Sequence, residues 1–118
     1  MTYNTAAVKG KSLKFEMHTV RRDNNPNLKF KGHTIGLADS RTLNPNNDMY
    51  WTELTLYFTT TGKYICEKKE LSIVQGNKNS FAAEVFDYIS DVVDFFGFDE
   101  SAKDLYLSAG LESDYFIG

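Results

Sequence analysis

The residues that could act as nucleophiles or metal ligands are few in this chain: one cysteine, Cys66, and two histidines, His18 and His33. A structural metal site needs several converging ligands, and neither a C-x-x-C nor an H-x-x-x-H spacing occurs. Cys66 lies on the apolar side of an alternating run, where cysteine usually behaves as a small apolar residue. A Cys–His nucleophile is conceivable, but nothing in the sequence places the two types together. We therefore expect no metal, no cofactor and no enzymatic activity.

Charge is the stronger functional signal, because the net charge of −3 conceals two unlike halves. Residues 1–78 hold 12 of the 13 Lys and Arg and 7 of the 16 Asp and Glu, a balance of +5. Residues 79–118 hold one basic residue, Lys103, and nine acidic ones, a balance of −8. Such asymmetry concerns partners and electrostatic fields rather than fold.

The acidic half predicts two helices. Apolar residues recur at helical spacing from residue 81 to residue 96, with Ser80 or Asn79 as the cap and Gly97 as the stop. A second helix is expected from a cap at Asp99 to Ala109. The carboxylates expected to form an acidic face that binds a basic protein are Glu84, Asp87, Asp91, Asp94, Asp99, Glu100 and Asp104. The competing interpretation is that an acidic helix simply keeps a small protein soluble.

The basic half offers a second surface, made of cations and two rings expected on an open sheet face. Its residues are Arg21, Arg22, Lys29, Lys31, Arg41, Trp51 and Tyr57. Such a surface could bind nucleic acid by contacting phosphates and stacking on bases. A pI near 5.3 and the lack of an RRM or helix-turn-helix pattern argue against it. The same two rings would equally suit a homodimer.

Strands are expected where apolar and polar residues alternate, over residues 13–19, from residue 28 to residue 37, and in a hairpin from residue 49 to about residue 73. Loops rich in Asn separate the first three runs, and Gly32 and Gly36 suggest a bulge in the second. In the hairpin, a three-residue turn with Gly62 in the left-handed region sets Phe58 against Tyr64. The same register sets Leu56 against Cys66, Thr55 against Glu67, and Glu53 against Lys69. It also puts Lys68 opposite Leu54, so we expect a bulge over residues 68–70.

These elements predict an α+β fold: an antiparallel β-meander of about four strands followed by two C-terminal helices packed on one face. The chain is expected to form a single domain, residues 1–118, with a basic sheet half and an acidic helical half. No run of 18 apolar residues is present, and residues 1–5 lack the features of a signal peptide. We therefore expect a cytoplasmic protein that does not contact a membrane.

The hairpin, Trp51-Thr52-Glu53-Leu54-Thr55-Leu56-Tyr57-Phe58-Thr59-Thr60-Thr61-Gly62-Lys63-Tyr64, resembles the W-T-E-L-x-L-Y-x-T-x-x-G-K-Y stretch of small bacterial proteins of unknown function. The later Phe95-Phe96-Gly97, and Ala102-Lys103-Asp104-Leu105-Tyr106 with Ala109-Gly110, resemble the F-F-G and A-K-E-L-Y-x-x-A-G ending of that group. Thr61 stands where the group has a glycine. The resemblance covers about half of the chain and carries no activity or catalytic residues. It implies an accessory protein of a plasmid, a phage or another mobile element.

Together these observations favour a non-enzymatic protein-binding module whose acidic helical face engages a basic surface. The sharpest form of the hypothesis is a nucleic-acid mimic: a host-defence inhibitor, of the anti-CRISPR or antirestriction kind, that occupies a groove built for phosphates. The alternative is a nucleic-acid-binding protein that uses the basic, aromatic sheet face.

Overall fold

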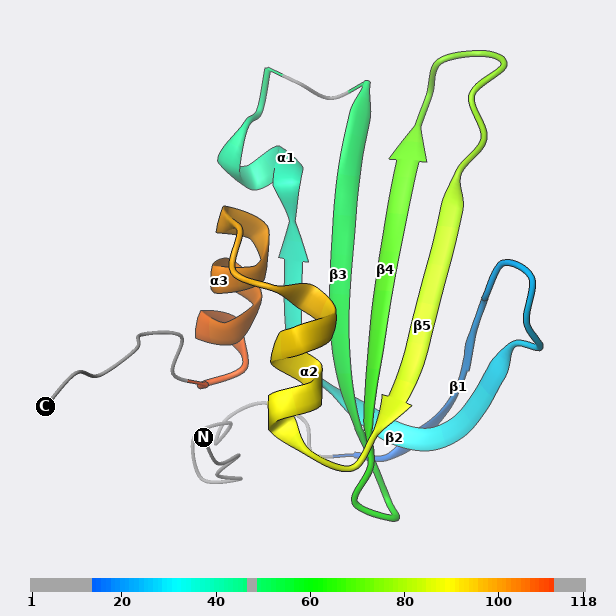
Figure 1. Cartoon of the computed structure of the whole chain (residues 1–118), viewed down its shortest axis with the longest axis vertical. Coiled ribbons are helices and arrows are strands. Elements are labelled where there is room, and N and C mark those ends of the chain that lie inside the picture. Colours follow the sequence, from blue (N-terminus) through cyan, green and yellow to red (C-terminus); the bar gives the residue numbers. More distant parts are fainter. Residues whose placement is uncertain (1–13, 47–48, 112–118) are drawn as a thin grey trace, which may run out of the picture.

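A five-stranded antiparallel sheet organises the residues that the computed structural model describes, 14–46 and 49–111 (Figure 1). The strands follow the chain in the order β1-β2-β3-β4-β5, as a meander. The elements are β1 (Glu16–Val20), β2 (Leu28–Asp39), α1 (Ser40–Leu43), β3 (Tyr50–Thr59), β4 (Tyr64–Ser72), β5 (Ser80–Phe86), α2 (Ile89–Phe96) and α3 (Glu100–Ser108). The α+β class is confirmed, with one strand more than expected. Within the described ranges, none of the helices is long and apolar enough to cross a bilayer.

The two C-terminal helices cover one face of the sheet. α3 packs against β2 and β3, while α2 packs against β4 and β5 (Figure 1). Alternation along the strands directs apolar side chains to this face, where they meet the buried sides of the helices. The resulting core consists of Ile35, Ala38, Leu54, Leu56, Cys66, Val92, Phe96, Ala102, Leu105, Tyr106, Ala109 and Leu111.

The expected register of the β3–β4 hairpin is confirmed. Phe58 pairs with Tyr64 and Leu56 with Cys66, and Gly62 has a φ of 81° in the turn. The expected bulge over residues 68–70 is wrong, because the ladder continues without interruption to the pair Tyr50–Ser72. Lys68 stays in register because its side chain remains 40% exposed, with its Nζ 3.6 Å from a Glu70 carboxylate oxygen. The sheet is irregular instead between Thr34 and Gly36 of β2, near the glycines that suggested a bulge.

The single helix expected over residues 81–96 is wrong in its first half. Residues 80–86 form β5 and pair with β4, and α2 begins only at Ile89. Residues four apart share a face in a strand as well as in a helix, so the spacing of Phe81, Val85 and Ile89 fits both. The second helix is confirmed: the Asp99 carboxylate accepts a hydrogen bond from the Ala102 N–H, and Gly110 has a φ of 72°.

Close packing joins α3 to the sheet at Gly36. A Cβ atom at this position would lie 2.9 Å from the Ala109 Cβ and 3.1 Å from the Leu105 Cδ1. Nearby, the fully buried Tyr106 donates a hydrogen bond of 2.6 Å from its hydroxyl to the Gly97 carbonyl, which ties α3 to the end of α2. Burial raises the pKa of Tyr106 to about 12, so its hydroxyl stays a donor at any ordinary pH.

The sheet curls, so that its first strands approach its last. The ring of His18 on β1 lies 4.9 Å from the ring of Tyr57 on β3, although β2 separates the two strands. Farther along, the Asp23 N–H donates to the Phe81 carbonyl at 2.9 Å, and the Asp23 carboxylate accepts from the Phe81 N–H at 3.0 Å. The β1–β2 loop therefore covers the start of the outer edge of β5.

Replacing Gly36 by valine should destabilise the fold by about 1–3 kcal/mol, because the added atoms must displace Ala109 or Leu105. The matched control is Leu37→Ala, which truncates a side chain that is 59% exposed and should change stability by no more than about 0.5 kcal/mol. Urea unfolding followed by far-UV circular dichroism measures both. A Gly36→Val protein as stable as the wild type would contradict this packing.

Candidate functional site

The structure divides the predicted acidic face into two groups. Glu84 lies on β5, where its carboxylate is 3.6 Å from the Arg22 guanidinium, and Asp87 follows that strand and pairs with Lys63. Both carboxylates therefore help to hold β5 to the rest of the sheet. The remaining residues of the set lie on α2, on α3 or at the cap between them.

We call this second group the acidic surface: Asp91, Asp94, Asp99, Glu100 and Asp104. The six ion pairs between described residues all lie on the sheet and its loops, and none involves the acidic surface. Asp99 has a structural role as the cap of α3, and Asp91 lies in the first turn of α2, where the helix dipole favours a negative charge. The other three carboxylates have no described partner, so their charge is available to an external group.

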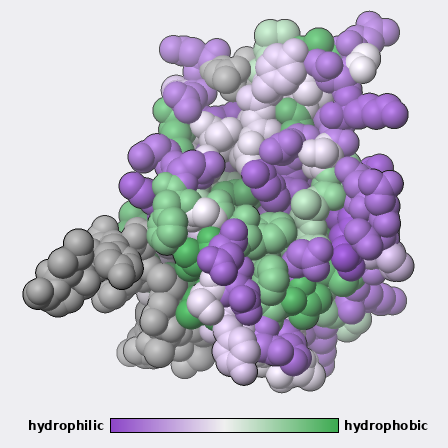
Figure 2. Space-filling model, in the orientation of Figure 1, coloured by the Kyte–Doolittle hydropathy of each residue, from purple (hydrophilic) through white to green (hydrophobic). Residues whose placement is uncertain are grey.

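Large apolar side chains accompany the acidic surface. Tyr88 is 70% exposed, Phe98 is 56% exposed and Leu107 is 77% exposed. Tyr88 directly precedes α2, Phe98 lies between α2 and α3, and Leu107 lies on α3. On the face drawn in Figure 2, hydrophilic side chains surround an apolar band over the region of these helices. The helical layer therefore presents carboxylates and exposed apolar groups together.

The predicted basic face is not one continuous surface. The Arg41 guanidinium lies 2.6 Å from an Asp39 carboxylate oxygen and 3.5 Å from one of Glu53, and it stacks 4.3 Å from the centre of the Trp51 ring. Arg22 is held by Glu84 on a different edge, while Lys29 and Lys31 lie exposed on β2. Most of these cations are thus matched within the molecule or separated from the rings.

The rings themselves are less open than the alternation indicated. Tyr57 is half-buried against the rings of His18 and Phe30, and its hydroxyl donates to the buried Glu67 carboxylate at 3.0 Å. Burial, and then the Glu67 charge, raise the pKa of Tyr57. Trp51 carries Arg41 on its ring and donates from Nε1 to Glu53 at 2.8 Å. The expectation of an uncovered stacking face failed because the sheet curls and brings β1 over β3.

Cys66 and the two histidines do not assemble into a nucleophilic pair. Cys66 is fully buried beneath the helices, and burial, with a smaller effect of Glu84, raises the pKa of its thiol. His18 lies in the curled part of the sheet with its Nε2 3.1 Å from the Gly32 carbonyl. His33 is buried edge-on to Phe15, and burial lowers its pKa. A thiol held neutral and enclosed does not suit nucleophilic catalysis.

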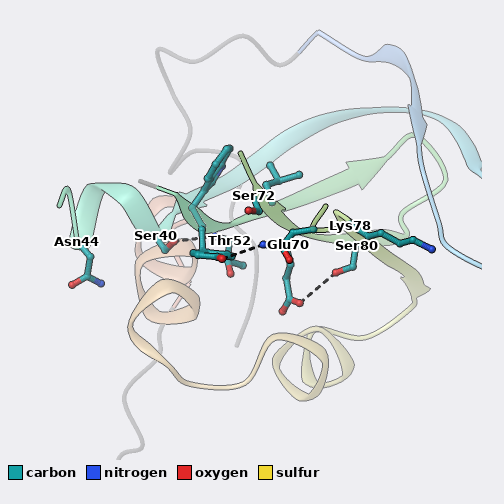
Figure 3. Close-up of a pocket in the computed structure, with 11 residues that line it drawn as sticks. Ser40, Asn44, Thr52, Glu70, Ser72, Lys78 and Ser80 are labelled. Carbon is teal, nitrogen blue, oxygen red and sulfur yellow. Dashed lines mark hydrogen bonds between the residues drawn. The ribbon is translucent and has the colours of Figure 1, made fainter. Parts of the chain in front are cut away.

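A polar pocket of about 560 Å³ lies where β3 begins and β4 ends, beside α1 (Figure 3). Its polar groups are largely engaged with one another. The Ser40 Oγ accepts from the Thr52 N–H at 2.9 Å, and the Ser80 hydroxyl donates to Glu70 at 3.3 Å. Its lining comes from five separate segments of the sequence, so no local motif could have predicted it. These internal bonds give the pocket a structural role at the end of the sheet.

The Asp39–Arg41 contact predicts a pH dependence. A hydrogen bond from Arg41 lowers the pKa of Asp39, so the pair stabilises the fold above the unfolded-state value of about 3.9 and this stabilisation is lost as the pH falls through the folded-state value. Asp39→Asn and Arg41→Gln should therefore each lose less stability than the wild type between pH 7 and pH 3. Urea midpoints at several pH values measure this, with Glu16→Gln, which removes an exposed carboxylate outside the six ion pairs, as the control.

The burial of Cys66 predicts a thiol that reacts only in the unfolded protein. Ellman's reagent should give almost no signal with the native protein and about one thiol per chain in concentrated guanidinium chloride, because the thiolate is both disfavoured and inaccessible. A rapid reaction of the native protein would show instead that Cys66 is reachable and would reopen the case for a nucleophile.

The chain was compared with protein-family models, with curated proteins and with solved structures, and none of them matches it.

Proposed function

We propose that this protein is a non-enzymatic protein-binding module whose acidic surface engages a basic surface of another protein. The observation that carries the proposal is the distribution of ion pairs. Six of the eight described carboxylates of the sheet and its loops lie within 4.0 Å of a cation of the same chain, the exceptions being Glu16 and Asp23. None of the described carboxylates of α2 and α3 has such a partner. An unmatched group of charges on one layer favours encounter with an opposite charge.

The exposed apolar residues favour a protein as the partner. Protein interfaces combine desolvated aromatic or aliphatic anchors with a polar rim, and single charged residues alone contribute little affinity. Tyr88, Phe98 and Leu107 supply such anchors beside the carboxylates. A surface that served only solubility would have no need of large apolar groups beside its charges.

The partner surface best suited to several carboxylates is one that already binds phosphates. In that form of the proposal the protein is a nucleic-acid mimic, encoded by a mobile element, that inhibits a host-defence system. The competing nucleic-acid-binding function is less well supported, because Arg41, Trp51 and Tyr57 are engaged within the molecule.

Charge reversal on the helices tests the proposal. The variant Asp94→Lys/Glu100→Lys changes two exposed carboxylates without touching the cap residue Asp99. Its affinity for a partner first captured with the wild-type protein, and then purified, should fall by at least about tenfold, because attraction becomes repulsion. Biolayer interferometry at two salt concentrations measures the loss and shows whether the wild-type affinity falls with salt.

The matched control is Glu16→Lys/Thr19→Lys/Thr60→Lys, which makes the same charge change of +4 at three exposed positions on β1 and in the β3–β4 turn. It should keep binding within about threefold of the wild type, and circular dichroism should show both variants folded. If the Asp94→Lys/Glu100→Lys variant binds the partner as tightly as the wild type does, the proposal is refuted.

Duplex DNA should compete with the protein for the partner if the occupied groove binds phosphates, and a lack of competition would exclude the nucleic-acid mimic.

A further inference from the structure

A second cleft lies at the outer edge of β5, and residues of the β1–β2 loop, the end of the β4–β5 loop and β5 line it. In Figure 1 the β1–β2 loop lies beside β5. Its volume is about 690 Å³, within the range of small-ligand sites. The lining residues are Arg21, Arg22, Asp23, Asn24, Asn27, Lys78, Asn79 and Phe81. Three of the eight carry a positive charge and three carry a side-chain amide.

The β1–β2 loop is fixed to β5. Asp23 and Phe81, 58 positions apart in sequence, exchange two hydrogen bonds, one through the Asp23 backbone N–H and one through the Asp23 carboxylate. The Arg22 guanidinium adds an ion pair to Glu84 on β5. Tertiary contacts therefore hold the β1–β2 side of the cleft in place against β5.

Cations reach the cleft from both loops. Arg21 is exposed, and its guanidinium carbon lies 4.3 Å from the centre of the Phe81 ring, which orients it without neutralising it. Lys78 is exposed and takes part in none of the ion pairs between described residues. In Figure 3 the Lys78 side chain extends away from the other labelled residues of the polar pocket. Both charges are thus available to a ligand.

The amides add donors rather than acceptors. The Asn27 Oδ1 accepts from the Arg22 N–H at 3.3 Å, and the Asn79 Oδ1 accepts from the Ser72 N–H at 3.0 Å. Because each oxygen already accepts one hydrogen bond from the backbone, the amide is oriented and its NH₂ group can donate to a ligand. The carboxylate in the lining, Asp23, is engaged with Phe81. The cleft consequently offers mostly N–H donors and positive charge.

We propose that this cleft binds a phosphate-bearing ligand through Arg21, Lys78 and the amide groups of Asn27 and Asn79. A phosphate carries up to two negative charges and three acceptor oxygens, so it can accept from a guanidinium, an ammonium and amides at once. The volume of the cleft favours a ligand larger than one orthophosphate. The phosphate can belong to a small phosphorylated molecule or to a nucleic-acid backbone, and this site is independent of the acidic surface.

Binding is tested with pyrophosphate, titrated into ¹⁵N-labelled protein at constant ionic strength and followed by NMR. Saturable shifts should appear in the backbone amides of Asn24, Asn27, Lys78 and Asn79. The variant Arg21→Gln/Lys78→Gln should bind at least about tenfold more weakly, because it removes two charge-assisted donors. The control Lys29→Gln/Lys31→Gln removes the same charge from two exposed residues outside the cleft and should stay within about twofold of the wild type.

A single-stranded oligonucleotide, titrated in the same way, distinguishes the two sources of phosphate. The site is assigned to a nucleic-acid backbone if the oligonucleotide binds more tightly than pyrophosphate, if salt weakens this binding, and if the Arg21→Gln/Lys78→Gln variant loses it. Binding of pyrophosphate without the oligonucleotide assigns it to a small phosphorylated molecule. The proposal is overturned if neither ligand gives saturable shifts, if both double variants lose affinity equally, or if sulfate binds as tightly as pyrophosphate.

Discussion

The register of the β3–β4 hairpin is the constraint on which the rest of the structure depends. Gly62 adopts a positive φ that permits a three-residue turn, and this turn places Leu56 opposite Cys66. A slip of one residue would exchange the two faces of the sheet and turn this apolar pair away from the helices. Because β2 and β5 pair with the outer edges of this hairpin, the same register also determines where α3 meets Gly36 and where α2 covers β4.

Curling of the sheet explains why its second face is not a simple open surface. A bulge between Thr34 and Gly36 separates two parts of β2. The second part supports α3, and the first part carries β1 toward the opposite face, where His18 meets Tyr57. Aromatic and polar groups that alternation alone would expose are thereby enclosed. The same curvature brings the β1–β2 loop to β5, so one distortion both encloses a ring cluster and forms the cleft beside Phe81.

Sequence reasoning succeeded where the pattern was local and failed where a distant contact decided the outcome. The hairpin and the capped helix α3 rest on turn and cap residues that act within a few positions, and both were predicted correctly. Residues 80–86 have apolar spacing that fits a strand or a helix, and only pairing with β4 selects the strand. The matching of Arg22 with Glu84 and of Lys63 with Asp87 depends on that pairing, so neither could be read from charge counts.

The ion pairs within the fold account for part of the charge asymmetry of the sequence. Arg22–Glu84 and Lys63–Asp87 join the basic half of the chain to the acidic half, so part of the asymmetry serves to fasten β5 and the turn after it. Exposed ion pairs of this kind contribute little stability individually, but each removes a cation and a carboxylate from the charge available to partners. The charged residues outside these ion pairs include two separate groups: carboxylates on α2 and α3, and cations at the loops beside β5. A partner that approaches either region meets an excess of one sign of charge, with Lys103 the exception on α3 and Asp23 the exception in the cleft. Such an excess favours oriented encounter more than a uniform mixture of the same residues would.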